Sequence, residues 1–194
     1  MTAIVAIPAR LKSTRFTRKV LAEIQGRPML WHVLQGVSQA NSIDGICVLT
    51  DSKEVSDIVS HWGYRALMTP EDCPSGTARI ATAINQLGAD IVVNVQADEP
   101  LITGAVVDAV VHSLENHHSE VSTPVYPITD IQELTDSNVV KVVRAVDGRA
   151  LYFSRSPIPH VRDVEKNEWV KSSDFWGHVG VYGSRGGNFA AQNS

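Results

Sequence analysis

Five basic residues lie close together near the start of the chain. Residues 10–19 hold five cations and no acid, and the first acidic residue is Glu23, although the chain carries a formal net charge of -4 at pH 7. Such a local excess of positive charge needs an anionic partner, and guanidinium and ammonium groups both suit phosphate oxygens. A polyanion such as a nucleoside triphosphate is therefore the natural candidate, and the alternative is a solvated loop whose charges do nothing specific. The five cations are Arg10, Lys12, Arg15, Arg18 and Lys19.

Glycine-based phosphate motifs are missing from the chain. None of its 13 glycines are spaced as G-x-G, so the dinucleotide fingerprint G-x-G-x-x-G cannot occur, and the P-loop pattern G-x-x-x-x-G-K-S/T does not occur either. These two observations argue against NAD binding and against P-loop chemistry. Phosphate groups would instead be held by side chains, and we expect Arg10, Arg15 and Lys19 to hold them.

A second stretch of interest is the apolar run of residues 90–100, which contains two acids near its end. In a parallel sheet this strand ends at the same edge as the strand expected at residues 3–7, so Asp98 should lie close to the basic loop formed by residues 10–19. Mg²⁺ typically binds one or two carboxylates together with phosphate oxygens and water, so one aspartate suffices for half of such a site. We therefore expect Asp98 to bind Mg²⁺ beside a polyphosphate. The alternative is that Asp98 only caps the turn before Pro100.

Strands and helices alternate along the first half of the chain. Apolar runs typical of buried strands are followed by segments with apolar residues at helical spacing. Such repeats predict an α/β fold with a doubly wound, mostly parallel sheet, whose ligands bind outside the carboxyl ends of the strands. Thr50 or Asp51 is expected to cap the helix after the second strand. The expected strands are residues 3–7, 45–51, 64–68 and 90–100, and the expected helices begin near residue 28 and cover 52–63, 75–88 and 105–114.

The second half of the chain predicts a smaller antiparallel portion. Apolar runs predict strands at 121–128, 139–146 and 175–183, and Asp147-Gly148 is a turn signal before ALYFSR. The polar segment 157–173 is expected to form an exposed loop or a short helix. Since neither an internal repeat nor a linker is found, residues 1–194 are expected to form a single domain.

Composition limits the classes of function. A sequence pI near 5.9 argues against a dedicated nucleic-acid binder, because such domains usually carry a basic face over much of the fold. Cys47 and Cys73 are the only cysteines, which predicts neither a disulfide framework nor a zinc site and favours a reducing, cytoplasmic compartment. No signal peptide is recognised, and no apolar run approaches the about 18 residues of a membrane span, so no membrane partner is expected.

Five motifs in series carry a family resemblance. They are PAR-x-x-STR-x-x-x-K-x-L in Pro8–Leu21, SGT-x-R in Ser75–Arg79, NVQ-x-DEP in Asn94–Pro100, ALYFSR in Ala150–Arg155 and H-x-G-x-YG-x-R in His178–Arg185. In this order and spacing the chain resembles the 3-deoxy-manno-octulosonate cytidylyltransferases, also called CMP-Kdo synthetases, from about Ile4 to Arg185. The resemblance implies the nucleotide-diphospho-sugar transferase fold. It also implies Mg²⁺-dependent transfer of a cytidylyl group from CTP to an acidic eight-carbon sugar, for lipopolysaccharide biosynthesis, with a homodimer in the intact family.

The same resemblance assigns roles to individual residues. Arg10, Arg15 and Lys19 would hold the triphosphate and Asp98 the metal. The cytidine side would fall to Ser75, Gly76 and Arg79, and the sugar acid to Gln96, Arg155, His178 and Tyr182. A guanidinium pairs well with a carboxylate, which supports Arg155. The plainer alternatives are a helix N-cap for Ser75, a core histidine for His178 and a half-buried aromatic for Tyr182.

The chain departs from the family pattern at several positions. Thr17-Arg18 stands where the family usually has Pro-Gly, which leaves the path of the basic loop open, and Ala97 replaces a glycine before Asp98. The tail SRGGNFAAQNS reads as a truncation, so the family's second metal carboxylate and part of its sugar pocket and dimer surface would lie beyond it. A CTP-binding module without turnover is therefore an alternative function, and a structural protein whose loop binds an acidic partner is another. Sequence does not choose between 3-deoxy-manno-octulosonate and an 8-amino analogue.

Overall fold

The computed structural model describes residues 1–11 and 18–186, and the chain divides into two units. The first unit comprises Met1–Ser122 and the chain from Val181 onward, and the second comprises Thr123–Gly180. Arg15 and Thr17 of the basic loop and the last eight residues of the tail lie outside the described residues. Each unit has a sheet and a hydrophobic core of its own.

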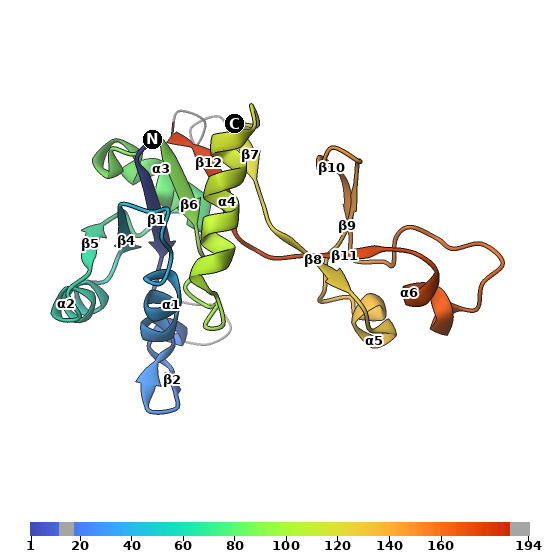
Figure 1. Ribbon diagram of the computed structural model, residues 1–194. Coiled ribbons are helices and arrows are strands. Elements are labelled where there is room, and N and C mark those ends of the chain that lie inside the picture. The colour runs from blue at the N-terminus through green and yellow to red at the C-terminus, as the bar shows by residue number, and fades with distance from the viewer. Residues whose placement is uncertain (12–17, 187–194) are drawn as a thin grey trace. The chain divides into compact units, whose positions relative to one another are not determined.

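The first unit contains a mixed sheet that is mostly parallel, as the sequence predicts (Figure 1). Its strand order is β5-β4-β1-β6-β12-β7; the first four strands are parallel, and β12 runs antiparallel to both β6 and β7. The elements are β1 (Ala3–Pro8), a 3-10 helix (Lys19–Leu21), β2 (Glu23–Ile24), β3 (Arg27–Pro28), α1 (Met29–Val37), β4 (Gly45–Thr50), α2 (Lys53–His61), β5 (Arg65–Met68), α3 (Gly76–Leu87), β6 (Ile91–Asn94), α4 (Gly104–Asn116), β7 (Val121–Ser122) and β12 (Tyr182–Arg185).

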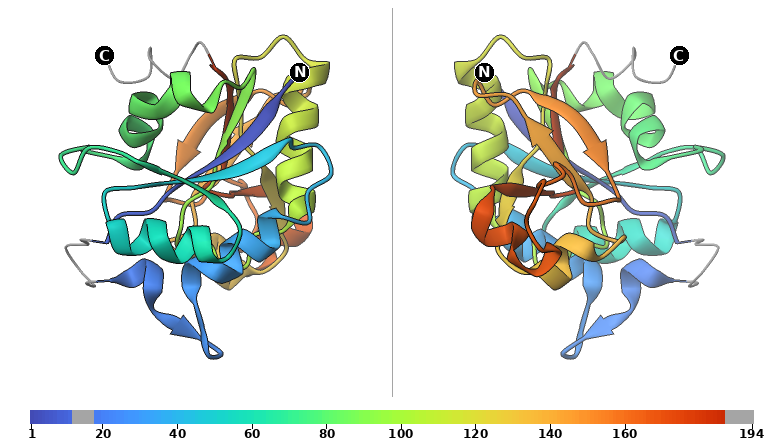
Figure 2. Two further views of the ribbon diagram at one scale, coloured as in Figure 1. Left: turned by 90° about the vertical axis from the view of Figure 1, so that its left-hand side faces the viewer. Right: turned by 90° about the vertical axis from the view of Figure 1, so that its right-hand side faces the viewer.

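Strand β1 is the buried centre of this sheet. Ile4 lies opposite Gly45 of β4 on one side and opposite Val92 of β6 on the other. Both faces of β1 are covered, which explains why it reads as a continuous apolar run and not as an alternating one. Helix α3 packs on the face that carries Ala6, and α4 packs on the opposite face, where Gly183 leaves room for its side chains (Figure 2).

Helix boundaries follow local capping chemistry. Ser52 Oγ accepts a hydrogen bond from the Val55 N–H at 3.4 Å and caps α2, so the expected cap at Thr50 or Asp51 was wrong. Ser52 is closer to the first turn of the helix, and the Asp51 carboxylate is used elsewhere. Helix α3 ends at Gly88, which has a left-handed φ of 63° that glycine adopts without a steric penalty. Within residues 1–11 and 18–186, no helix has both the length and the apolar character that crossing a membrane requires.

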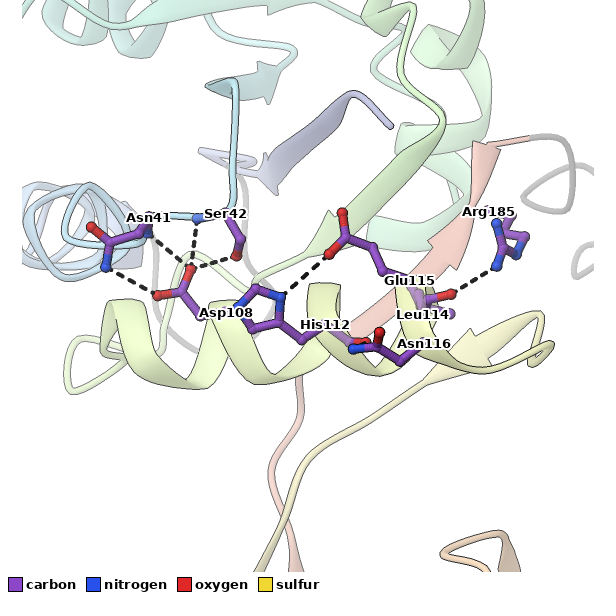
Figure 3. A network of polar contacts seen from close by, with 8 residues as sticks. All are labelled: Asn41, Ser42, Asp108, His112, Leu114, Glu115, Asn116 and Arg185. Atoms are coloured by element: carbon purple, nitrogen blue, oxygen red, sulfur yellow. Dashed lines mark hydrogen bonds and ion pairs between the residues drawn. The ribbon is translucent and has the colours of Figure 1, made fainter.

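A network of polar contacts ties α4 to the loop between α1 and β4 (Figure 3). Asp108 Oδ1 accepts hydrogen bonds from the N–H of Asn41 (2.9 Å), the N–H of Ser42 (2.9 Å) and the hydroxyl of Ser42 (2.5 Å). Burial raises the pKa of Asp108, but the hydrogen bonds from Ser42 and Asn41 outweigh this and leave the pKa below its ordinary value. At the other end of α4, Arg185 Nη2 donates to the carbonyl of Leu114 at 2.7 Å.

The second unit contains the expected antiparallel portion. Its strand order is β10-β9-β11-β8, and its small core includes Ile128, Leu134, Trp169 and Phe175. The polar segment 157–173 forms a loop that ends in a short helix, as predicted. The elements are β8 (Val125–Ile128), α5 (Ile131–Thr135), β9 (Lys141–Arg144), β10 (Ala150–Ser154), a 3-10 helix (Lys166–Glu168), α6 (Trp169–Ser172) and β11 (Phe175–His178).

Two strand predictions were wrong in the same way. Residues 121–128 form two strands, β7 and β8, and residues 175–183 contribute to β11 and β12; in each case the two strands belong to different sheets. Pro124 has no N–H for a ladder, and its carbonyl accepts from the Val179 N–H at 3.0 Å, outside either strand. An apolar run indicates which residues are buried but does not indicate in which sheet they pair. The strand predicted for residues 90–100 is also shorter and ends at Asn94.

We predict that Asp108→Ala lowers the free energy of unfolding by about 1–3 kcal/mol, because it removes the hydrogen bonds that a charged carboxylate accepts from Asn41 and Ser42. Urea denaturation of the whole chain measures this change. The matched control is Asp57→Ala on α2, which removes only an exposed ion pair with Lys53 and should cost about 0.5 kcal/mol or less. Equal unfolding midpoints for the two variants would show that the network does not stabilise the fold.

Candidate functional site

The side of the sheet to which successive strands are added changes at β1. Strands β4 and β5 add on one side of β1, and β6 then pairs with its other side. Ligands bind outside the carboxyl ends of the strands at such a switch point. Past the strand ends, the Ala9 N–H donates to the Leu49 carbonyl at 2.8 Å and the Val95 N–H donates to the Ala6 carbonyl at 3.1 Å. The residues that follow β1 and β6 therefore start from one edge of the sheet.

A cavity of about 120 Å³ lies at this edge. Five of the residues that sequence reasoning selected line it, although they come from three separate motifs. The lining consists of Pro8, Arg10, Cys73, Ser75, Gly76, Arg79 and Gln96. Arg10 is exposed and forms no ion pair within the described part of the chain, so its guanidinium is available to an anion.

The beginning of α3 forms one wall of the cavity. Ser75 Oγ accepts a hydrogen bond from the Ala78 N–H at 3.0 Å, so Ser75 is the N-cap that the plainer interpretation expected. A Cβ atom on Gly76 would come within 2.9 Å of Pro8 Cγ and 3.4 Å of Gln96 Oε1. Glycine is therefore needed for the helix to approach the end of β1. A helix N-terminus presents N–H groups and a partial positive charge, which favours an anion in this cavity.

Arg79 is almost fully buried, with 2% of its side chain exposed. Its Nη2 donates to Asp51 Oδ2 at 3.0 Å, and its Nη1 donates to the Thr69 hydroxyl and to the Pro70 carbonyl. Through the contacts with Thr69 and Pro70, the Arg79 guanidinium holds the segment that follows β5. This segment continues to Cys73, which lines the cavity. Sequence reasoning missed Asp51 as the partner of Arg79, and the available signal was an acid directly after a buried strand.

Gln96 is held in one orientation. Its Nε2 donates to Asn94 Oδ1 at 2.9 Å, and Asn94 itself is buried at the end of β6. With the Nε2 group engaged, Oε1 is turned toward the first turn of α3, where it lies 3.4 Å from the position that a Gly76 Cβ would occupy. The Gln96 side chain therefore presents a hydrogen-bond acceptor on the α3 side of the cavity.

Lys19 and Asp98 form an ion pair, with 2.5 Å between Lys19 Nζ and Asp98 Oδ2. The prediction that Asp98 lies close to the basic loop is confirmed for this lysine. Both side chains are about two-fifths exposed, so solvent and ligands reach them. Burial raises the pKa of the neighbouring Glu99, and the charge of Asp98 raises it further. A second negative charge at this position is therefore disfavoured unless another cation is present.

The metal expectation rests on Asp98 alone. Within residues 1–11 and 18–186, no group of three or more His, Cys, Asp or Glu side chains lies close enough to hold a metal ion. The hard carboxylate oxygens of Asp98 suit Mg²⁺, which takes few protein ligands and completes its shell with phosphate and water. The residues present therefore fit a metal that arrives with a polyphosphate.

The remaining predicted residues do not belong to this cavity lining. Arg155 and His178 lie in the second unit; Arg155 Nη1 donates to the Ser137 carbonyl at 2.8 Å, and His178 Nε2 lies 2.8 Å from the Thr123 hydroxyl. Tyr182 lies in the first unit on β12 and is 41% exposed; burial of part of the ring raises the pKa of its hydroxyl. The proposed role of Arg15 concerns a residue outside the described ones.

Lys141 of the second unit was missed by sequence reasoning. It is completely buried, and its Nζ donates to the carbonyls of Asp136 (2.8 Å) and Val139 (2.6 Å). Burial lowers the pKa of Lys141. Together with Arg155, it holds three carbonyls of the turn before β9. A lysine inside the apolar run NVVKVV was the available signal.

The comparisons with known proteins agree with the geometry. A family model described as cytidylyltransferase matches residues 4–192. The chain is 42% identical to a 3-deoxy-manno-octulosonate cytidylyltransferase of Francisella tularensis subsp. novicida over 185 residues, which are 93% of this chain and 74% of the relative. It is also 42% identical to the protein of the same name from Acidobacterium capsulatum, over 92% of this chain and 71% of that one. A solved structure of CMP:2-keto-3-deoxy-manno-octonic acid synthetase complexed with CTP is 33% identical, with a TM-score of 0.90 over 99% of this chain and 77% of that one.

We predict that Gly76→Ala destabilises the chain by about 1–3 kcal/mol, because the added methyl group would overlap the rigid ring of Pro8. Urea denaturation measures the change. Gly45→Ala is the matched control, since the nearest atom to its Cβ is the flexible end of Ile4 at 3.2 Å, which can move aside. The packing argument fails if both variants unfold at the same midpoint.

His178 is predicted to titrate below its ordinary pKa of 6.5, because burial disfavours the charged ring. The neutral ring then stabilises the native state fully above pH 6.5, and this contribution is lost as the pH falls from 6.5 through the folded-state pKa. NMR titration of the ring protons measures the pKa directly. The same titration in urea is the control and should return the ordinary value, and a native pKa of 6.5 or higher would contradict the prediction.

Proposed function

The chain belongs to the 3-deoxy-manno-octulosonate cytidylyltransferases of the cytidylyltransferase family, and from this premise we propose that it transfers a cytidylyl group from CTP to 3-deoxy-manno-octulosonate or a close acidic analogue. The products would be the CMP-sugar and pyrophosphate. The observation that carries the proposal is the cavity in which Arg10, the start of α3 and Gln96 meet at the switch point of the sheet. A role of the product in lipopolysaccharide biosynthesis is part of the proposal.

The chemistry is a displacement at phosphorus. The anomeric hydroxyl of the sugar attacks the α-phosphorus of CTP, a new P–O bond forms, and the bond to the oxygen of the leaving pyrophosphate breaks while the hydroxyl proton is released. Such a reaction depends on alignment of the two reactants and on neutralisation of the charge that develops on the phosphates. The protein therefore needs cations at fixed positions around a cavity that is formed before the reactants bind.

We assign the triphosphate to the cations that follow β1. Arg10 lies in the cavity wall and Lys19 lies next to Asp98, so each is placed to interact with phosphate oxygens. Arg15 is assigned with them on the motif alone. The N–H groups in the first turn of α3 would add fixed donors without further side-chain ordering.

Asp98 is proposed to hold Mg²⁺ together with the nucleotide. When bound, the ion would neutralise charge on the triphosphate and help to orient it. In the structure Lys19 neutralises this carboxylate, at 2.5 Å. Lys19 would therefore exchange its carboxylate partner for phosphate oxygens when the nucleotide binds, which keeps the local charge balanced.

On the motifs alone, we assign the sugar acid to Gln96, Arg155, His178 and Tyr182. Gln96 presents an oxygen acceptor that can take a hydrogen bond from a sugar hydroxyl. Arg155 uses one terminal nitrogen on the Ser137 carbonyl and is exposed, so its remaining donors can pair with the carboxylate of the sugar.

Two measurements test the function. Thermal unfolding with each of the four nucleoside triphosphates and Mg²⁺ should show the largest rise in melting temperature with CTP, because a ligand that binds only the native state stabilises it. Pyrophosphate release with CTP and 3-deoxy-manno-octulosonate then separates turnover from binding. Stabilisation by CTP without pyrophosphate release would indicate a nucleotide-binding module. The absence of a preference for CTP would reject both the transferase and the CTP-binding module.

We predict that Asp98→Asn keeps the fold and lowers Mg²⁺-dependent turnover by about 100-fold or more, since an amide is a poor ligand for a hard divalent cation. Initial rates across a range of Mg²⁺ concentrations measure the effect. Asp147→Asn is the control, because it also breaks an exposed ion pair, with Arg149, but lies in the turn after β9. Normal rates and an unchanged Mg²⁺ response of Asp98→Asn would exclude Asp98 as the metal ligand.

A further inference from the structure

Arg18 has a left-handed backbone conformation, with φ 63° and ψ 26°. Two other described residues that are not glycine have positive φ, and one of them, Gln25, lies with Gly26 in the tight turn between β2 and β3. Arg18 lies in no hairpin turn; it immediately precedes the 3-10 helix Lys19–Leu21. In this region the Cβ atom of any residue other than glycine comes too close to the following carbonyl oxygen, so the conformation persists where surrounding contacts impose it.

Backbone hydrogen bonds on both sides of Arg18 impose part of this conformation. The Arg18 N–H donates to the Leu11 carbonyl at 3.1 Å, and the Arg18 carbonyl accepts from the Leu21 N–H at 2.9 Å. The first bond brings together the two ends of the basic loop. The second bond closes the turn that carries Lys19.

The side chain supplies the other restraint. The guanidinium of Arg18 makes a two-pronged contact with Glu54, at 3.0 Å from Nη1 to Oε2 and 2.5 Å from Nη2 to Oε1. Surface ion pairs usually contribute little, but a paired fork of this kind is the geometry in which they are most effective. Glu54 lies in the first turn of α2, where the helix dipole also favours a carboxylate.

Arg18 and Lys19 are consecutive but contact acids on different elements. Glu54 belongs to the helix that follows β4, and Asp98 belongs to the segment that follows β6. Because β1 lies between β4 and β6 in the sheet, this pair of residues is anchored on both sides of the strand from which the loop starts. The Glu54 contact thus restrains the residue that directly precedes the proposed phosphate-binding lysine.

We propose that Glu54 is a positioning residue for nucleotide binding: through Arg18 it holds the left-handed backbone that places the Lys19 ammonium beside Asp98. Glu54 and Arg18 need not touch the nucleotide themselves. The ligand in this inference, CTP, rests on the proposed function, whereas the restraint on the backbone does not. The opposite arrangement, in which Arg18 binds phosphate and Glu54 competes with it, predicts that loss of Glu54 strengthens binding.

The test uses Glu54→Gln, Arg18→Gly and the double variant, with Asp57→Asn as the matched control. Glu54→Gln should weaken CTP binding by about 3- to 10-fold, measured by calorimetry, and raise the KM for CTP with little change in kcat. Glycine adopts the left-handed conformation without help, so in the Arg18→Gly background the same Glu54 change should alter affinity by less than about twofold. Asp57→Asn breaks the Lys53–Asp57 ion pair on the same helix and should change nothing.

Hydrogen exchange gives a second readout that needs no nucleotide. The Leu21 and Ala22 amides, which donate to the carbonyls of Arg18 and Lys19, should exchange faster in Glu54→Gln than in the wild type or Asp57→Asn. Unchanged exchange together with unchanged CTP affinity would overturn the inference, and so would tighter CTP binding by Glu54→Gln. If the wild type binds no CTP but the exchange rates respond as expected, the proposed function fails while the positioning of Lys19 by Glu54 stands.

Discussion

Strand β1 pairs in parallel with β4 on one side and with β6 on the other, and the candidate site depends on this pairing. Parallel pairing brings the carboxyl ends of all three strands to one edge, which is where Arg10 and Gln96 line the same cavity. The strands are buried on both faces, so a shift in register would move each side chain to the opposite face and disrupt its packing against the covering helices. The geometry of the site is therefore stabilised by the core of the first unit and does not depend on the loops alone.

Buried charge makes the cavity wall rigid. The side chains of Arg79 and Asp51 are both largely buried. The terminal nitrogens of the Arg79 guanidinium donate to the Asp51 carboxylate, the Thr69 hydroxyl and the Pro70 carbonyl. Removing one partner of such a pair typically costs about 3–5 kcal/mol, because the other charge is left buried and unpaired. The wall that ends at Cys73 is thus held by an interaction that this chain cannot lose without a loss of stability.

Two of the cations assigned to ligands, Lys19 and Arg155, already have partners in the structure. Lys19 contacts Asp98, and Arg155 donates to the Ser137 carbonyl, so each is held in place before a ligand arrives. Anion binding at such groups is an exchange of partners, and its free energy is the difference between two sets of contacts. Arg10 is exposed and has no acidic partner among the residues that the structure describes, so its full charge is available to the first phosphate that approaches. This division suits a site that attracts a triphosphate and then orders it.

The sequence by itself determined the βα repeats of the first unit, the antiparallel character of the second and five of the seven residues that line the cavity. These features are local, because burial period, helix caps and short motifs such as SGT-x-R are visible in a few consecutive residues. Only the tertiary structure decided where the runs 121–128 and 175–183 divide between sheets, and which acid each cation meets. Asp51 lies 28 residues from Arg79, and Glu54 lies 36 residues from Arg18, and such contacts depend on strand order, which no local pattern records. The left-handed conformation of Arg18 was equally out of reach, because arginine disfavours it and the side-chain contact that helps to impose it comes from Glu54, 36 residues away.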